Sequence, residues 1–256
     1  EIMPSLVGSE MCIRDSDKID IVYEDENILL VDKPVGMVVH EDESGDSDTL
    51  INRIKSYLYR KGEYHPENEL SFAPALCNRI DRNTCGIVIA AKNAESLRIL
   101  NQKIRDRELT KLYLCIACGK VTPDSATLTA YLEKNSDTNT VKISDKKTKS
   151  NLTIKTKYKV IAYNGENSLL KVDLLTGRTH QIRAHLAYIG HALLGDGKYG
   201  NNKLNKKYGF KYQALCSYEL QFKFTTDAGC LSYLDGKCFK AKAPDFVKMF
   251  GANIKL

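Results

Sequence analysis

Short β-type segments follow one another along most of this chain, often with only a turn between them. In these segments apolar and polar residues alternate or β-branched residues gather, which is typical of strands. They are residues 19–23, 28–32, 37–40, 86–91, 112–116, 127–132, 151–161, 168–175, 212–220 and 221–225. Parallel strands need long crossover connections, and most of these segments lie too close together for one. The sequence therefore predicts an α+β fold with a mixed, mostly antiparallel central sheet and flanking helices and loops.

Helices are expected at three places where apolar residues recur with helical spacing. The first begins at Leu50 and ends at Gly62, and the second follows Asn93, a residue suited to cap a helix. The third covers residues 179–189, with Thr179 as its cap. No linker or internal repeat divides the chain, so we expect these elements to form one domain.

Two stretches lack a periodic pattern. Residues 135–150 are polar, and we predict a loop there. Residues 1–16 show no helical or strand spacing, and we interpret them as an irregular tail or an artefact of sequence assembly. The folded domain is therefore expected to span residues 17–256.

Charge and cysteine usage limit the class of protein. The formal net charge is +6 and the sequence pI is about 8.7, a balance that suits a nucleic-acid partner without being specific for one. Eight cysteines are scattered through a Lys-rich chain in which no secretory leader is evident, a pattern typical of free thiols in a reducing compartment. No apolar stretch approaches the length of a membrane span. We expect a cytoplasmic protein that does not enter a membrane.

The first segment suited to chemistry is residues 78–86, a polar turn that precedes a buried strand. Asp81 lies in this turn between Arg79 and Arg82. Neighbouring cations favour an ionised carboxylate and also suit contacts with phosphate. The alternative is that Asp, Asn and Thr here only form a turn by bonding to nearby backbone, which is the more frequent role of such residues.

The second such segment is residues 174–185, where a strand ends and a helix begins. The exposed N–H groups of a helix start favour anions, and Arg178 and His180 add positive charge. Arg183 lies at the edge of the apolar stripe, where a guanidinium is suited to bind a carboxylate in bidentate geometry. The alternative is a capped amphipathic helix with a solvated basic face.

Tyr113 and a Cys-x-x-Cys pair lie in one predicted strand. Tyr113 is suited to stacking on a nucleic-acid base, although packing against the sheet is the commoner role of a strand tyrosine. Cys115 and Cys118 point to opposite faces of a strand, and Cys230 and Cys238 do not complete a zinc site with them. We interpret all eight cysteines as ordinary thiols.

Together these segments resemble the RluA family of pseudouridine synthases, from about Asp20 to the end of the chain. Residues 22–40 are similar to the family's opening strand pair and its Lys-Pro-x-Gly loop. Residues 79–86 resemble its Arg-Leu-Asp-x-x-Thr-Ser-Gly motif. Residues 177–186 resemble its Gly-Arg-Thr-His-Gln-Ile-Arg-x-His motif, and residues 195–200 continue the match.

The resemblance implies a pseudouridine synthase fold and the isomerisation of specific uridines in structured RNA. Ribosomal RNA of the large subunit is the expected target and transfer RNA the rival. The implied reaction needs neither a metal nor another cofactor, and the expected state is a monomer. Asp81 takes the position of the catalytic Asp, Tyr113 that of an active-site Tyr, and Arg183 that of the Arg that pairs with the Asp. The expected RNA contacts are Arg79, Arg82, Arg178, His180 and Gln181.

The sequence departs from the family pattern in a few places. Asn78 stands where many members have His, and Cys85 stands where Ser or Gly is usual. Many members also carry a small N-terminal RNA-binding domain, and no counterpart to it is evident in this sequence. Two alternatives remain open: a catalytically silent RNA-binding protein on the same scaffold, and a thiol or zinc protein that uses Cys115 and Cys118.

Overall fold

The central sheet dominates the computed structural model, which describes residues 18–41, 48–68, 72–135, 138–251 and 254–256. Within these residues eleven strands form one sheet, whose main path runs β1-β2-β4-β10-β5-β9-β8-β6-β7. The strands are β1 (Asp20–Glu24), β2 (Ile28–Lys33), β3 (Ala75–Leu76), β4 (Cys85–Ala91), β5 (Leu109–Cys118), β6 (Ser125–Asn135), β7 (Thr140–Ser144), β8 (Leu152–Tyr163), β9 (Asn167–Leu174), β10 (Leu215–Phe222) and β11 (Cys238–Lys240). The predicted tail at residues 1–16 lies outside the described residues.

Nearly all neighbouring strands run antiparallel, which confirms the predicted sheet. The parallel pair is β4 with β10, where Cys85 lies opposite Cys216 and Gly86 opposite Ser217. This short junction joins one part of the sheet, β1 to β4, to the other, which begins with β10 and β5. The segment that carries Asp81 leads directly into β4, so Asp81 lies close in sequence to the junction between the two parts.

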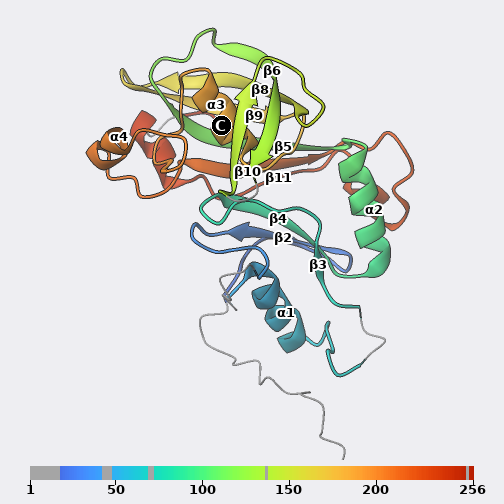
Figure 1. Cartoon of the computed structure of the whole chain (residues 1–256). Helices are drawn as coiled ribbons and strands as arrows, with labels where there is room; N and C mark the ends of the chain where they lie inside the picture. The colour runs from blue at the N-terminus through green and yellow to red at the C-terminus, as the bar shows by residue number, and fades with distance from the viewer. Residues whose placement is uncertain (1–17, 42–47, 69–71, 136–137, 252–253) are drawn as a thin grey trace, which may run out of the picture.

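Helices pack on both parts of the sheet (Figure 1). They are α1 (Leu50–Arg60), α2 (Ala94–Arg105), α3 (Gln181–Tyr188) and α4 (Asn202–Lys207), with 3-10 turns η1 (Gly229–Leu234) and η2 (Asp245–Phe250). Thr49 and Asn93 cap α1 and α2 with their side chains, because each accepts a hydrogen bond from the third N–H beyond it. Figure 1 shows α3 inside the curve made by β6, β8 and β9, and Ala184 of α3 belongs to the apolar cluster there.

Residues 37–40 were predicted as a strand, and that prediction is wrong. Val38 makes only an isolated bridge with Thr49. The cause is Lys33, which is fully buried and donates hydrogen bonds from Nζ to the carbonyls of Pro34 and Met37 at 2.8 and 2.7 Å. The chain wraps around this amine instead of extending. The same amine also donates to the carbonyl of Arg82 at 2.9 Å, which ties residues 34–37 to the segment that carries Asp81.

Two further predictions about strands need correction. Part of the predicted loop at residues 135–150 is strand β7, in which Val141 and Ile143 are buried in the cluster around α3. Polar flanking residues hide this short alternation in the sequence. The segments 212–220 and 221–225 are not two strands, because one strand, β10, spans Leu215–Phe222 and pairs with β5 along its length.

The start of α3 also differs from the prediction. His180, not Thr179, is the N-cap residue, and its backbone is left-handed with φ 53°. Its side chain makes no capping hydrogen bond. The imidazole is used elsewhere, in the cavity described below.

Gly86 is required by the close approach of β4 to β10. Its φ is +107°, and a Cβ there would lie 2.2 Å from the carbonyl oxygen of Ser217. We expect Gly86→Ala to lower the free energy of unfolding by about 4 kcal/mol or more, since backbone strain and a backbone clash add together. Gly165→Ala is the matched control, because its φ is +94° but no atom lies within 4 Å.

Urea unfolding of both variants tests this assignment. The control should lose about 1–2 kcal/mol, the effect of left-handed strain alone. Equal losses in the two variants would show that the β4–β10 contact does not limit this position.

Candidate active site

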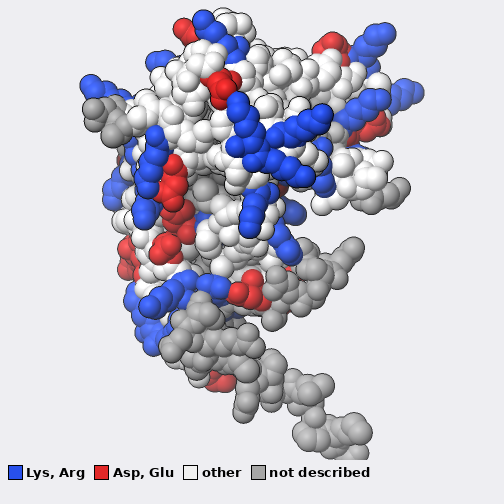
Figure 2. Space-filling view, turned by 90° about the vertical axis from the view of Figure 1, so that its left-hand side faces the viewer, with Lys and Arg blue, Asp and Glu red and all other residues white. Residues whose placement is uncertain are grey.

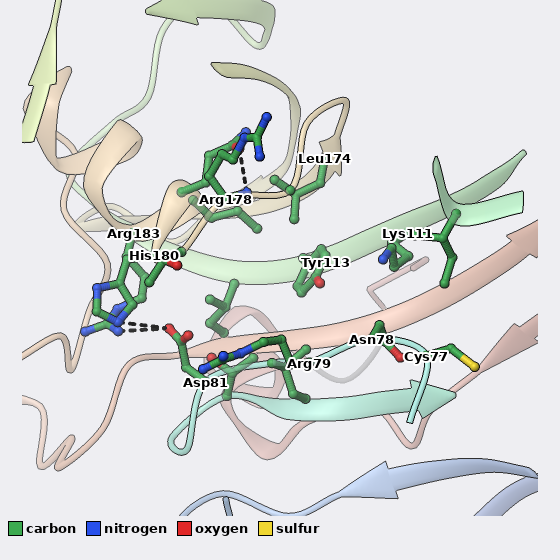
Figure 3. A pocket seen from close by; sticks show the side chains of 18 of the residues that line it. Cys77, Asn78, Arg79, Asp81, Lys111, Tyr113, Leu174, Arg178, His180 and Arg183 are labelled. Atoms are coloured by element: carbon green, nitrogen blue, oxygen red, sulfur yellow. Dashed lines mark hydrogen bonds and ion pairs between the residues drawn. The ribbon is translucent and has the colours of Figure 1, made fainter. Parts of the chain in front are cut away.

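A cavity of about 290 Å³ opens where three segments far apart in the sequence meet. It is lined by residues 77–81 before β4, by Lys111 and Tyr113 of β5, and by residues 177–183 at the start of α3. Figure 3 shows Asp81, Arg183 and His180 at one end of it and Lys111, Asn78 and Cys77 at the other. The predicted Asp81, Tyr113 and Arg183 all line this cavity, so the fold brings them together.

Asp81 is held through one of its two carboxylate oxygens. Arg183 donates a hydrogen bond from Nη1 to Oδ2 of Asp81 at 2.9 Å, and the Asp81 side chain is 28% exposed (Figure 3). His180 Nε2 lies 3.8 Å from the same oxygen. Within the described part of the chain, no hydrogen bond or ion pair involves Oδ1. One oxygen is therefore fixed by the protein, and the other has no partner among the described residues.

The bidentate partner of Arg183 is Asp196, whose importance the sequence reasoning missed. Arg183 Nε and Nη2 donate to the two carboxylate oxygens of Asp196 at 2.7 and 3.0 Å, and Asp196 is completely buried. Burial alone would raise the pKa of Asp196, but the Arg183 hydrogen bonds and charge outweigh it and hold the pKa below its ordinary value. Asp196 thus fixes the guanidinium so that its remaining nitrogen reaches Asp81. The signal for this role was the match at residues 195–200.

Tyr113 lies in the cavity wall between the two ends (Figure 3). The residue is only 6% exposed. Burial raises the pKa of the Tyr113 phenol to about 12, an effect that a hydrogen bond with Ser217 partly opposes. The phenol is therefore neutral at ordinary pH, and the ring offers an apolar surface beside Asp81.

His180 is linked to a second aromatic residue that the sequence reasoning did not single out. Nδ1 of His180 lies 2.9 Å from the hydroxyl of Tyr199, and the two rings meet edge to face. Tyr199 Oη also accepts a hydrogen bond from the backbone N–H of Val141 in β7 at 2.9 Å. The Arg183 guanidinium lies 5.3 Å from the centre of the Tyr199 ring, a cation–π distance.

The predicted RNA contacts differ in their exposure and in whether they line the cavity. Arg79 and Arg178 are exposed and line the cavity, whereas Arg82 is exposed but outside its lining. Gln181 is 2% exposed and its amide is committed to the protein: Oε1 accepts from Thr176 and from the Arg178 backbone, and Nε2 donates to Lys155 and Thr156. These contacts argue against the predicted role of Gln181 in RNA binding. It instead closes the turn before α3.

Positive charge dominates the cavity. Its lining includes five cations, Arg79, Arg107, Lys111, Arg178 and Arg183, against one carboxylate, Asp81. Apart from Arg183, none of these cationic side chains forms a hydrogen bond or ion pair with a residue that the structure describes. Burial lowers the pKa of Lys111, and the charge of Arg107 acts in the same direction. A broad band of Lys and Arg side chains also crosses the face shown in Figure 2 and borders its notch. Such a surface suits a ligand with several negative charges.

Other kinds of site find little support among the described residues. No group of three or more His, Cys, Asp or Glu side chains there is arranged to hold a metal ion. Cys115 and Cys118 belong to different apolar clusters, as expected for opposite faces of β5. None of the described helices is both long and apolar enough to cross a membrane.

Comparison with known proteins identifies the family. Residues 27–188 match the family model described as RNA pseudouridylate synthase. An uncharacterized RNA pseudouridine synthase of Mycoplasma genitalium is 38% identical over 213 residues, which cover 80% of this chain and 64% of that protein. The ribosomal large subunit pseudouridine synthase D of Borreliella burgdorferi is 33% identical over 190 residues, which cover 74% of this chain and 57% of that protein. The chain thus spans less than two thirds of the length of these relatives.

The fold has a close counterpart among solved structures. The human RNA pseudouridylate synthase domain containing 4 superposes with a TM-score of 0.70 at 20% sequence identity, covering 90% of each chain. This likeness confirms the predicted pseudouridine synthase fold, and the sequence matches confirm the resemblance drawn from the motifs. The chain belongs to the RNA pseudouridylate synthase family.

Proposed function

We propose that this protein isomerises uridine to pseudouridine in RNA and that Asp81 is its catalytic carboxylate. The observation that carries the proposal is the state of Asp81 in the cavity: Arg183 holds Oδ2 at 2.9 Å, and Oδ1 has no partner among the described residues. A carboxylate fixed in this way keeps one oxygen available for a substrate. A silent RNA-binding protein would need no such arrangement.

The chemistry of the reaction fits a site built around one carboxylate. The bond between C1′ of ribose and N1 of uracil breaks, a bond between C1′ and C5 forms, and one proton leaves C5 while one is gained at N1. The reaction involves no net oxidation or hydrolysis. Asp81 must be ionised to attack C1′ or to remove the proton at C2′, and the adjacent Arg183 cation stabilises that ionised form. Both routes use the same oxygen and the same support.

The cations of the cavity give the RNA a place to bind. A uridine inside a stacked helix cannot reach Asp81, and turning it out costs a few kcal/mol, least in loops and bulges. Arg79, Arg107, Lys111 and Arg178 are suited to hold the phosphates that flank the turned-out nucleotide. We assign the Tyr113 ring to the face of the uracil.

Ribosomal RNA of the large subunit is our proposed target. The relative from Borreliella burgdorferi named for that activity is matched over 57% of its length. The mitochondrial tRNA pseudouridine(32) synthase of Saccharomyces cerevisiae is 31% identical and is matched over 38% of its length. The broader match favours the ribosomal target, and the experiment below separates the two.

The proposal is tested on total RNA from cells that lack the corresponding synthase. Purified protein is added, and new pseudouridines are mapped by carbodiimide-dependent stops of reverse transcription. We expect stops in large-subunit ribosomal RNA with the wild-type protein and none with Asp81→Asn. Stops confined to transfer RNA would change the target but keep the activity. If no stops appear although RNA is bound, the protein is a silent RNA-binding member of the family.

Arg178 offers a separate test of the RNA surface. We expect Arg178→Ala to reduce the slope of log Kd against log salt concentration by about 0.7 to 0.9, the contribution of one phosphate contact in single-stranded or duplex nucleic acid. Lys248→Ala is the control, because Lys248 is exposed, lies outside the cavity and pairs with Asp245. Fluorescence anisotropy on a structured RNA measures both slopes. An unchanged slope for Arg178→Ala would remove this residue from the RNA contacts.

A further inference from the structure

His180 bears several costs to stability at one position. Its backbone is left-handed with φ 53°, a conformation that costs a residue other than glycine about 1–3 kcal/mol. It occupies the N-cap of α3 without a capping hydrogen bond. Its imidazole is only 8% exposed, so it has also lost most of its contact with water. These unfavourable features all fall on one residue beside Asp81. They indicate that the His180 side chain serves the active site and not the stability of α3.

The hydrogen bonds around Tyr199 favour one tautomer of His180. Tyr199 Oη already accepts the N–H of Val141, and it has a single proton of its own to donate. Nδ1 of His180, at 2.9 Å, is its acceptor within the described structure. We therefore assign Nδ1 as the acceptor of the Tyr199 proton, which places the ring proton of the neutral imidazole on Nε2. That is the nitrogen 3.8 Å from Oδ2 of Asp81.

The imidazole is surrounded by charges of both signs. Burial lowers the pKa of His180; the Asp81 carboxylate opposes that effect, and Arg183 and Lys198 reinforce it. Asp196 is a further carboxylate that acts to raise the pKa. The net direction is downward, so the ring is neutral near neutral pH.

We propose that His180 is a positioning residue for Asp81, with its neutral Nε2–H as a second donor to the carboxylate and Tyr199 as the group that sets the tautomer. This inference rests on the proposed function. Asp81 loses its negative charge in the first step, whether it bonds to C1′ or takes the proton from C2′. A neutral donor loses less interaction energy at that moment than a second full cation would. The 3.8 Å separation closes to a hydrogen bond when substrate fills the cavity.

Two substitutions separate this role from a structural one. Asn tolerates the left-handed conformation and is a preferred N-cap, but its short amide reaches only the Nδ1 position. Gln places an N–H donor near the Nε2 position. We expect His180→Asn to melt no lower than the wild type, to bind RNA with unchanged Kd and to lose about 10- to 100-fold in kcat. His180→Gln should keep most of the wild-type kcat.

The pH profile supplies a readout that a purely structural residue would not move. When His180 gains a proton, Nδ1 can no longer accept from Tyr199, and a full cation stands beside Asp81. The wild-type kcat should therefore fall as the pH drops through the pKa of His180, which burial holds below the ordinary value of an imidazole. In His180→Gln this acid limb should be absent or displaced to lower pH. Tyr199→Phe should reduce kcat less in the His180→Gln background than in the wild type.

The possible results separate the proposed pseudouridine synthase activity from the proposed role of His180. A wild-type protein that forms no pseudouridine in any RNA would remove the proposed function. With an active wild type, full activity of His180→Asn would overturn the positioning role. Loss of RNA binding with unchanged kcat would also overturn it, because His180 would then be a contact to RNA. His180→Gln as impaired as His180→Asn would contradict donation from Nε2.

Discussion

Asp81→Asn is expected to abolish pseudouridine formation, by on the order of 10⁴-fold or more in kcat, with little change in RNA affinity. The amide has the shape of the carboxylate and can still accept the hydrogen bond from Arg183 Nη1 through its oxygen. It offers neither a negative charge to attack C1′ nor a basic oxygen to remove a proton from C2′. The cations that line the cavity are untouched, so binding should persist.

The loss of the C5 proton gives a direct measurement of this effect. RNA labelled with tritium at C5 of uridine releases the label to water with each turnover, and single-turnover rates exclude differences in product release. Asp245→Asn is the matched control, since Asp245 is exposed, lies outside the cavity and pairs with Lys248. Turnover by Asp81→Asn at the wild-type rate would contradict the assignment of Asp81 as the catalytic carboxylate.

Arg183→Met should lower the free energy of unfolding by about 3–5 kcal/mol and also abolish activity. The reason lies in Asp196, which is completely buried and would lose both hydrogen bonds from the guanidinium. Asp81 would lose its ion pair at the same time. The free energy of unfolding of Arg183→Lys should lie between those of the wild type and Arg183→Met. A single ammonium cannot bind Asp196 through two nitrogens and reach Asp81 as well.

The double variant Arg183→Met/Asp196→Asn separates stability from catalysis. Removing the buried charge should restore much of the lost unfolding free energy, whereas Asp81 remains without its partner and activity stays absent. The pH dependence gives a second check. In the wild type the lowered pKa of Asp196 contributes stability above its unfolded pKa, and this contribution is lost as the pH falls through the folded pKa. In Arg183→Met that contribution should disappear. An Arg183→Met protein as stable as the wild type would contradict the role of the pair.

The sequence was most informative where a pattern is local. Alternation located most strands. Helix α1 begins at Leu50 as predicted, and Asn93 caps α2 as predicted. The motifs predicted that Asp81, Tyr113 and Arg183 would share a site, and they line one cavity. Strand β7 was not predicted because its five residues lie in a polar stretch. The cluster around α3 buries Val141 and Ile143 only in the folded chain.

The rest depends on distances that a sequence does not contain. An arginine near a carboxylate motif indicates a pair, but only the fold shows that Arg183 binds Asp196 with two nitrogens and Asp81 with the third. Arg107 and Lys111 lie outside the strongest motifs and become relevant because β5 runs along the cavity. The left-handed backbone of His180, and its place at the N-cap of α3 instead of Thr179, are visible only in the folded chain.

The junction between β4 and β10 has a consequence for the order of events during synthesis on the ribosome. β10 lies 130 residues after β4, yet it stands between β4 and β5 in the sheet. A nascent chain can pair β1 with β2 and β2 with β4, and later β5 with β9, before β10 has emerged. The two parts can be joined only afterwards, when β10 enters the gap and Leu215 completes the cavity wall. Until then the edges of β4 and β5 are open to pairing with other chains.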